Sequence, residues 1–150
     1  MIRLATYNVE WFANLFDQQN ALINDDSWSG RYNVQKSQQI AALGHVFRTI
    51  NADAIMVIEA PNSGGTQSSK AALETFAKHF KLRQNTAIVG FENDTQQEIA
   101  LLYDPQKVDV LHDPKGPESG AEGSRVAPRF DGVFQLDLDI DAEPDTVNFS

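Results

Sequence analysis

Cysteine is absent from the sequence, which excludes disulfides and thiolate metal ligands. Long apolar runs are absent as well. None approaches the roughly 20 residues that a membrane-spanning helix needs, so we expect no membrane span. The amino terminus lacks the basic and apolar regions of a signal peptide, which makes the cytoplasm the default expectation and leaves secretion open. The motifs G-x-x-x-x-G-K-[ST], H-E-x-x-H and G-x-S-x-G are also missing.

Basic residues are scarce: 12 Lys and Arg stand against 21 Asp and Glu, for a formal net charge of -9. An acidic surface repels phosphate backbones, so we do not expect a broad, nonspecific nucleic-acid groove. A local site at which bound cations reverse the sign of the charge stays open. The 150 residues suffice for one domain with a sizeable core, and no sharp shift in composition marks a second domain.

The first third of the chain predicts a strand, a helix and a second strand. Residues 2–9 are expected to form a strand with Ile2, Leu4 and Thr6 on its buried face. Residues 34–50 are expected to form a helix, with Asn33 as its N-cap and an apolar stripe of Ile40, Leu43, Phe47 and Ile50. The buried run at 54–58 follows. This order favours a parallel crossover connection.

The rest of the chain predicts one more helix and several strands. A helix over residues 70–80 is expected to be capped by Ser68 or Ser69. Residues 113–128 are rich in Pro, Gly and Ser and are expected to form a mobile loop. The expected strands are 85–91, 98–103, 107–111 and 132–140, with the start of another at 147–149. The predicted fold class is α/β (α+β), with a mixed sheet and flanking helices.

Three acidic patterns have plain structural explanations. The pair Asp25 and Asp26 has the residue types of a cation site, but a charge pair in a loop is usually just solvated. Asp137 and Asp139 match a metal-binding D-x-D, yet simple alternation along a half-buried strand also explains them. His112 with Asp113 ends a strand, and we expect the pair to cap an exposed edge.

Two buried strands each end on an oxygen-bearing side chain, Asn8 in the first and Glu59 in the second. Ligands commonly bind at the carboxyl ends of parallel strands. A carboxylate with an amide beside it suits a hard cation such as Mg²⁺, which keeps several waters and takes one or two carboxylates. The structural alternative has Asn8 capping a turn and Glu59 pairing with a surface cation.

These residues resemble a known family. The segments Leu-Ala-Thr-Tyr-Asn-Val at 4–9 and Asn-Ala-Asp-Ala-Ile-Met-Val-Ile-Glu at 51–59 resemble the opening of the endonuclease/exonuclease/phosphatase superfamily, which has the deoxyribonuclease I-like fold. Glu-Ala-Pro-Asn at 59–62 is similar to the Glu-x-x-Asn of many members. Ile-Ala-Leu-Leu-Tyr-Asp-Pro at 99–105 is similar to the next central strand. The likeness extends over nearly the whole chain, in order.

The resemblance implies a four-layer αββα sandwich and the metal-dependent hydrolysis of a phosphoester. It implies that Glu59 and Asn8 are catalytic and together form the metal site, with Glu59 a metal ligand and Asn8 orienting the metal shell or the phosphate. Asn62 is a weaker candidate for substrate binding. The implied cofactor is Mg²⁺, or Mn²⁺ or Ca²⁺, which offsets phosphate charge and activates water.

The family also requires an Asp-x-Asn pair, a catalytic His and a terminal Asp-His. The sequence contains no Asp-x-Asn and no Asp-His. We therefore expect residues 1–150 to be the amino-terminal portion of the fold, truncated before the second half and inactive alone. The partners would be that carboxyl-terminal half and a phosphoester, such as nucleic acid, a lipid or inositol headgroup, or a small molecule. The alternative is a non-catalytic binding or structural domain on the same scaffold.

Overall fold

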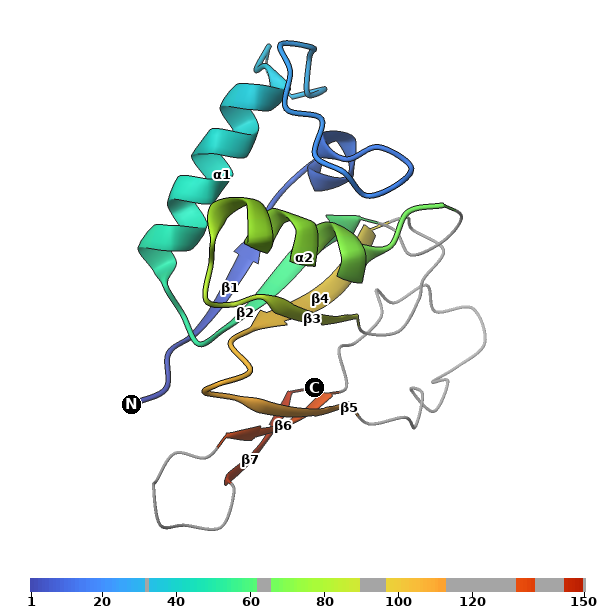
Figure 1. Ribbon diagram of the computed structural model, residues 1–150. Helices are drawn as coiled ribbons and strands as arrows, with labels where there is room; N and C mark the ends of the chain where they lie inside the picture. Colours follow the sequence, from blue (N-terminus) through green and yellow to red (C-terminus); the bar gives the residue numbers. More distant parts are fainter. Residues whose placement is uncertain (32, 62–65, 90–96, 113–131, 137–144, 150) are drawn as a thin grey trace.

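The computed structural model describes residues 1–31, 33–61, 66–89, 97–112, 132–136 and 145–149 (Figure 1). None of the helices in these ranges has the length and apolar character needed to cross a membrane. The elements are, in chain order, β1 (Leu4–Asn8), the 3-10 helix η1 (Phe12–Leu15), α1 (Lys36–Ile50), β2 (Ala54–Pro61), α2 (Ser69–Phe80), β3 (Thr86–Val89), β4 (Gln97–Tyr103), β5 (Asp109–His112), β6 (Gly132–Leu136) and β7 (Asp145–Phe149).

The first four strands form one mixed sheet in the order β1-β2-β4-β3. β1 pairs with β2 in parallel, and the connection between them runs through α1, as the sequence predicts. β4 is antiparallel to both of its neighbours. A mixed sheet with two helices confirms the predicted α+β class.

One face of this sheet carries the main core. α1 packs over β1, where the rings of Tyr7 and Phe47 meet edge to face with centroids 5.6 Å apart. α2 joins the same core through Phe76, whose ring lies 5.2 Å from those of Phe47 and Phe12. Full burial of each such ring stabilises the fold by about 1.5–3 kcal/mol. The fully buried large apolar side chains are Phe12, Phe47, Phe76, Leu15, Ile40, Ile55, Leu73, Leu102, Val9 and Val57.

The starts of the two helices differ from expectation in one case. Asn33 was the expected N-cap of the first helix, and this is wrong: α1 begins at Lys36, with Gln35 as its N-cap. Asn33 has a left-handed backbone with φ 57°, whereas an N-cap residue normally has an extended one. The second helix begins as predicted, since the Ser68 hydroxyl accepts a hydrogen bond from the Ala71 backbone N–H at 3.3 Å.

The buried face of β1 is also the opposite of the expected one. Leu4 is 45% exposed, and Thr6 and Asn8, which share its face, are exposed too. Ala5 and Tyr7 pack against the core instead. The apolar Ile2 and Leu4 suggested the other face, but the helices cover the side that presents Tyr7 to Phe47. Asn8 therefore lies on the face of the sheet that the helices leave uncovered.

The remaining strands form a second, antiparallel sheet in the order β5-β6-β7 (Figure 1). Val110 of β5 packs against a small apolar cluster on the helix-free face of the first sheet, centred on Ala54 and Leu101. The expected strands at 107–111, 132–140 and 147–149 correspond to β5, β6 and β7. The expected loop at 113–128 and the pair Asp137 and Asp139 lie outside the described residues, as does Asp113.

Candidate functional site

Asn8 and Glu59 meet at the carboxyl ends of β1 and β2. The Asn8 side-chain Nδ2 donates a hydrogen bond to Glu59 Oε1 at 3.1 Å. Their strands are paired in register, with Asn8 opposite Ile58, and the Val9 backbone N–H donates to the Ile58 carbonyl at 3.1 Å just beyond. The two side chains that the sequence singles out are thus brought together. Asn62, the third candidate, lies outside the described residues.

A β-bulge sets the position of Glu59. The pairing of β2 with β4 shifts between Ile58 and Ala60, which leaves Glu59 as the extra residue. Strict alternation would place Glu59 on the helix-covered face with Val57, which is fully buried. At the bulge, Glu59 has a left-handed φ of 64° and its carboxylate reaches Asn8 on the open face. The sequence gives no sign of this bulge.

The chain just after Asn8 also has an unusual backbone. Glu10 has φ 33° and Trp11 has φ 57°, both in the region that glycine usually occupies. The Asn8 side-chain Oδ1 accepts a hydrogen bond from the Glu10 backbone N–H at 3.0 Å, which fixes this turn. Left-handed non-glycine residues cost about 1–3 kcal/mol each and cluster at functional sites. Three such residues, Glu10, Trp11 and Glu59, lie at this one end of the sheet.

Glu10 is neutralised by a cation of its own. Arg31 Nη2 lies 2.7 Å from Glu10 Oε2, and the buried Gln39 donates to the Glu10 backbone carbonyl at 3.2 Å. Burial raises the pKa of the nearby Tyr7 phenol, with Arg31 acting to lower it and Glu10 to raise it. Glu59, in contrast to Glu10, forms no ion pair within the described part of the chain.

The pair offers a small donor set for a cation. Among the described residues, no group of three or more His, Cys, Asp or Glu side chains surrounds a common point. Glu59 Oε1 is hydrogen-bonded to Asn8, and Oε2 makes no hydrogen bond within the described ranges. One carboxylate beside one amide fits Mg²⁺, which keeps most of its waters and takes few protein ligands. The exposed Asp25 and Asp26 instead accept hydrogen bonds from Ser27 and Ser37.

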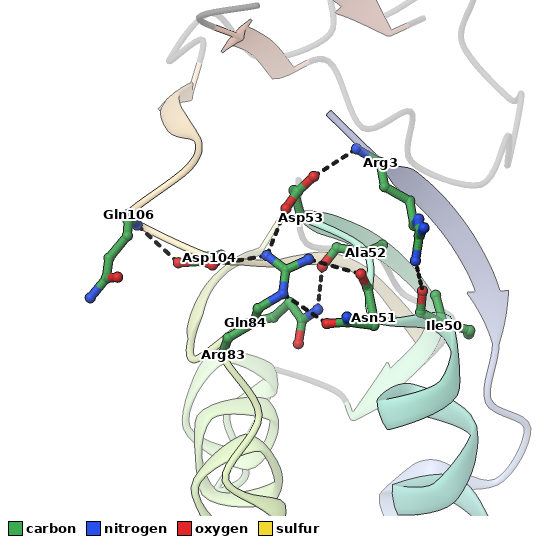
Figure 2. Close-up of polar contacts among 9 residues, drawn as sticks. All are labelled: Arg3, Ile50, Asn51, Ala52, Asp53, Arg83, Gln84, Asp104 and Gln106. Atoms are coloured by element: carbon green, nitrogen blue, oxygen red, sulfur yellow. Dashed lines mark hydrogen bonds and ion pairs between the residues drawn. The ribbon is translucent and has the colours of Figure 1, made fainter. Parts of the chain in front are cut away.

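A second polar cluster lies at the other end of β2 and was not predicted. The Arg83 guanidinium lies between two carboxylates, with Nη1 2.6 Å from Asp53 Oδ1 and 2.9 Å from Asp104 Oδ2 (Figure 2). It also donates to the Asn51 side chain and backbone carbonyl, each at 2.8 Å. Asp53 Oδ2 accepts from the Arg3 backbone N–H at 2.7 Å. The cluster ties together the ends of β1, α1, β2 and β4.

The charges in this cluster favour one another. Burial acts to raise the pKa of Asp53, but hydrogen bonds from Arg3 and Arg83 outweigh it and the net shift is downward. Burial acts to lower the pKa of Arg83, and the bonds to Asp104 and Asp53 raise it overall. Both shifts favour the charged forms of Asp53 and Arg83. The charged groups of the cluster pair with one another, so we assign the cluster a role in stabilising the fold rather than in binding a ligand.

Comparisons with known proteins found no likeness for the chain: no protein-family model matches it, and neither does any curated protein or any solved structure.

Proposed function

We propose that the chain belongs to a divalent-metal-dependent phosphoester hydrolase of the endonuclease/exonuclease/phosphatase type. The observation that supports this most is the 3.1 Å contact between Asn8 and Glu59 at the ends of two parallel strands. The left-handed backbone of Glu59 at the bulge costs free energy of folding, and such strain is typical of functional positions. The motifs that carry the resemblance lie on β1, β2 and β4, the three neighbouring strands of the sheet.

In this proposal Glu59 is a ligand of Mg²⁺ or Mn²⁺ and Asn8 holds the Glu59 carboxylate in place. The Asn8 amide is itself fixed, because its oxygen is bonded to Glu10 and its nitrogen to Glu59. A bound cation would offset phosphate charge and lower the pKa of a bound water. Arg31 pairs with Glu10 and so offsets the charge of a second carboxylate in this part of the chain.

We further propose that the fold is the amino-terminal portion of a four-layer sandwich. The helices α1 and α2 and the sheet β1-β2-β4-β3 supply two layers, and the second sheet, β5-β6-β7, is the candidate for a third. Support comes from the helix-free face of the first sheet, where Met56, Ile88 and Ile99 pack against the cluster of Ala54 and Leu101. Val110 of β5 packs against the same cluster. The remaining catalytic groups would come from residues beyond these 150.

The test is hydrolysis of a bis-aryl phosphodiester and of DNA by the protein of the complete reading frame, with Mg²⁺ or Mn²⁺. Glu59→Gln should reduce the rate by at least 100-fold, on the scale of losing a metal-bound charge. Glu74→Gln is the matched control, since Glu74 accepts a backbone hydrogen bond from Ala87 and a glutamine oxygen can do the same. A Glu59→Gln rate equal to that of the control would refute the ligand role.

The non-catalytic alternative has its own outcome in the same experiment. A domain that only binds phosphoesters would retain Mn²⁺ binding at Glu59, measured by paramagnetic broadening of the Asn8 side-chain amide signal, and would cleave none of the substrates. Loss of both broadening and cleavage in Glu59→Gln, with both retained in Glu74→Gln, would support the hydrolase.

A further inference from the structure

A pocket of about 630 Å³ is lined by residues that take no part in the proposal above. Its walls come from η1, from the segment between η1 and α1, and from residues 66 and 67 before α2. Pockets of about 300–1,000 Å³ are the usual size for small-molecule ligands. The side chains that matter for its chemistry are Phe16, Ile23, Trp28, Asn14, Lys36 and Gln67.

Hydrogen bonds hold the walls of this pocket in place. Gln67 Nε2 lies 3.2 Å from the Phe16 carbonyl and 3.4 Å from those of Ala13 and Asp17, which ties the chain before α2 to the end of η1. Asn14 Nδ2 donates to the Ser29 carbonyl at 3.1 Å. A Cβ on Gly30 would come within 2.9 Å of that amide, and the Gly30 φ of 88° also disfavours a side chain there. The pocket is therefore shaped before any ligand binds.

Trp28 and Lys36 are the two pocket side chains whose chemistry bears most on a ligand. Trp28 is 64% exposed, although its backbone is fixed by a bridge to Gln35. An indole left in water forgoes the burial that most tryptophans make. Lys36 is partly buried and makes no ion pair within the described part of the chain. It does act on Asp25, whose pKa is lowered by hydrogen bonds from Ser27 and also by the charge of Lys36. An open aromatic face beside an ammonium group suits a ligand that is both planar and anionic.

The pocket also continues from the strands that carry Asn8 and Glu59. Ala13 in its wall follows Asn8 by five residues, which limits their Cα separation to about 18 Å even for an extended chain. The real separation is shorter, because residues from Phe12 onward are helical. Thr66 in the opposite wall follows Glu59 by seven residues. η1, which carries Ala13, also contacts β2, so the pocket and the candidate site share neighbouring elements.

We propose that this pocket binds a nucleotide, with the base stacked on Trp28 and the phosphate near Lys36. The role of this pocket in catalysis rests on the proposed function. If the pocket serves that function, the substrate class is narrowed to nucleic acid or a nucleotide. Bases stack on exposed aromatic rings regardless of sequence. Inositol and sugar phosphates lack an aromatic face, and headgroups with several phosphates call for more cations than one lysine. The amide oxygens of Asn14 and Gln67 are available as acceptors for a base edge, since among the described residues only their nitrogens are bonded.

The two tryptophans of the chain make a direct test possible. Trp11→Phe leaves Trp28 as the only indole, so its fluorescence reports on the pocket alone. We would titrate this 150-residue protein with adenosine monophosphate in the presence of a chelator, and with inositol monophosphate and inorganic phosphate as comparison ligands. Quenching by adenosine monophosphate only is the expected result. Equal quenching by inositol monophosphate, or none by any ligand at millimolar concentration, would overturn the proposal.

Substitutions then locate the two contacts by calorimetry. Trp28→Leu should weaken binding of adenosine monophosphate about tenfold or more, as the loss of base stacking does elsewhere. Lys36→Gln should weaken the binding of adenosine monophosphate and leave the binding of adenosine unchanged. Lys78→Gln, on the exposed face of α2, should change the affinity for neither ligand. Unaltered affinity in Trp28→Leu would contradict the stacking. These binding measurements contain a chelator and no metal ion. If Glu59→Gln had no effect on hydrolysis, the measured binding of adenosine monophosphate would therefore be unaffected, and the two proposals can fail separately.

Discussion

Asn8 and Glu59 are 51 positions apart in the sequence, and a single hydrogen bond of 3.1 Å joins their side chains. The contact depends on two backbone features, the parallel pairing of β1 with β2 and the bulge that turns Glu59 toward the open face. Neither residue is buried, so the hydrogen bond itself adds little to stability. The backbone of Glu59 is strained, and the partly exposed carboxylate that it holds adds little to stability. Stability alone therefore does not explain the residue at this position.

Glu59→Gly should therefore stabilise the fold while abolishing activity. Glycine adopts φ 64° without the steric cost of a side chain, a gain of about 1 kcal/mol in the free energy of unfolding. Urea denaturation of the 150-residue protein measures this gain, and the hydrolysis and Mn²⁺ experiments measure the loss. Lys81→Gly is the matched control: Lys81 has φ 52° at the carboxyl end of α2, so it should give a similar gain and leave activity intact. A destabilised Glu59→Gly would show that the carboxylate serves the fold.

The sequence predicts the elements that depend on local pattern. The apolar run at 54–58 predicts a buried strand, and Ile55 and Val57 in it are fully buried. The helical spacing of Ile40, Leu43 and Phe47 predicts a buried stripe, and all three side chains are buried. A parallel crossover also predicts that the two strand ends lie at one edge of the sheet. The contact between the Asn8 and Glu59 side chains requires the bulge as well. The exposed face of β1 and the position of the helix start at Lys36 depend on tertiary packing, and both were predicted wrongly.

Features built from distant residues could not be predicted. The bulge at Glu59 appears only in the pairing of β2 with β4, about 40 positions further along the chain. Arg83 reaches Asp53 across 30 positions, and nothing in the local sequence marks either residue. The pocket is likewise formed by two segments that the sequence describes only as loops, with Gln67 bonded to carbonyls about 50 positions earlier.

Gly44 should resist substitution although it lies inside α1. A Cβ at this position would overlap the ring of Phe80, which packs against Phe76 with centroids 4.8 Å apart. Helix propensity alone favours alanine by about 1 kcal/mol, whereas overpacking costs about 1–3 kcal/mol, so Gly44→Ala should be destabilising. The sign should reverse when Phe80 is already alanine, because only the propensity term remains. A double-mutant cycle by urea denaturation measures both values, and two additive substitutions would contradict the packing argument.

The Arg83 cluster should make stability depend on pH in the acid range. Arg83→Met removes the cation between Asp53 and Asp104, whose side chains are only 10% and 8% exposed. Breaking a buried pair costs about 3–5 kcal/mol, and we expect about 3 kcal/mol because the Arg83 side chain is 34% exposed. Lys70→Met is the control, since Lys70 forms an exposed pair with Glu74 at 4.0 Å and should change stability by less than about 0.5 kcal/mol.

The sign of the pH effect follows from the lowered pKa of Asp53. A carboxyl whose pKa is lower in the folded state contributes stability above its unfolded pKa of about 3.9, and loses it as the pH falls through the folded value. The unfolding free energy of the unsubstituted protein should thus drop on acidification below about pH 4. In Arg83→Met the two carboxylates face each other, so protonation relieves repulsion and the drop should shrink or reverse. Urea denaturation from pH 3 to 7 measures the difference between the proteins, and parallel pH profiles would show that Arg83 does not hold Asp53 in its charged form.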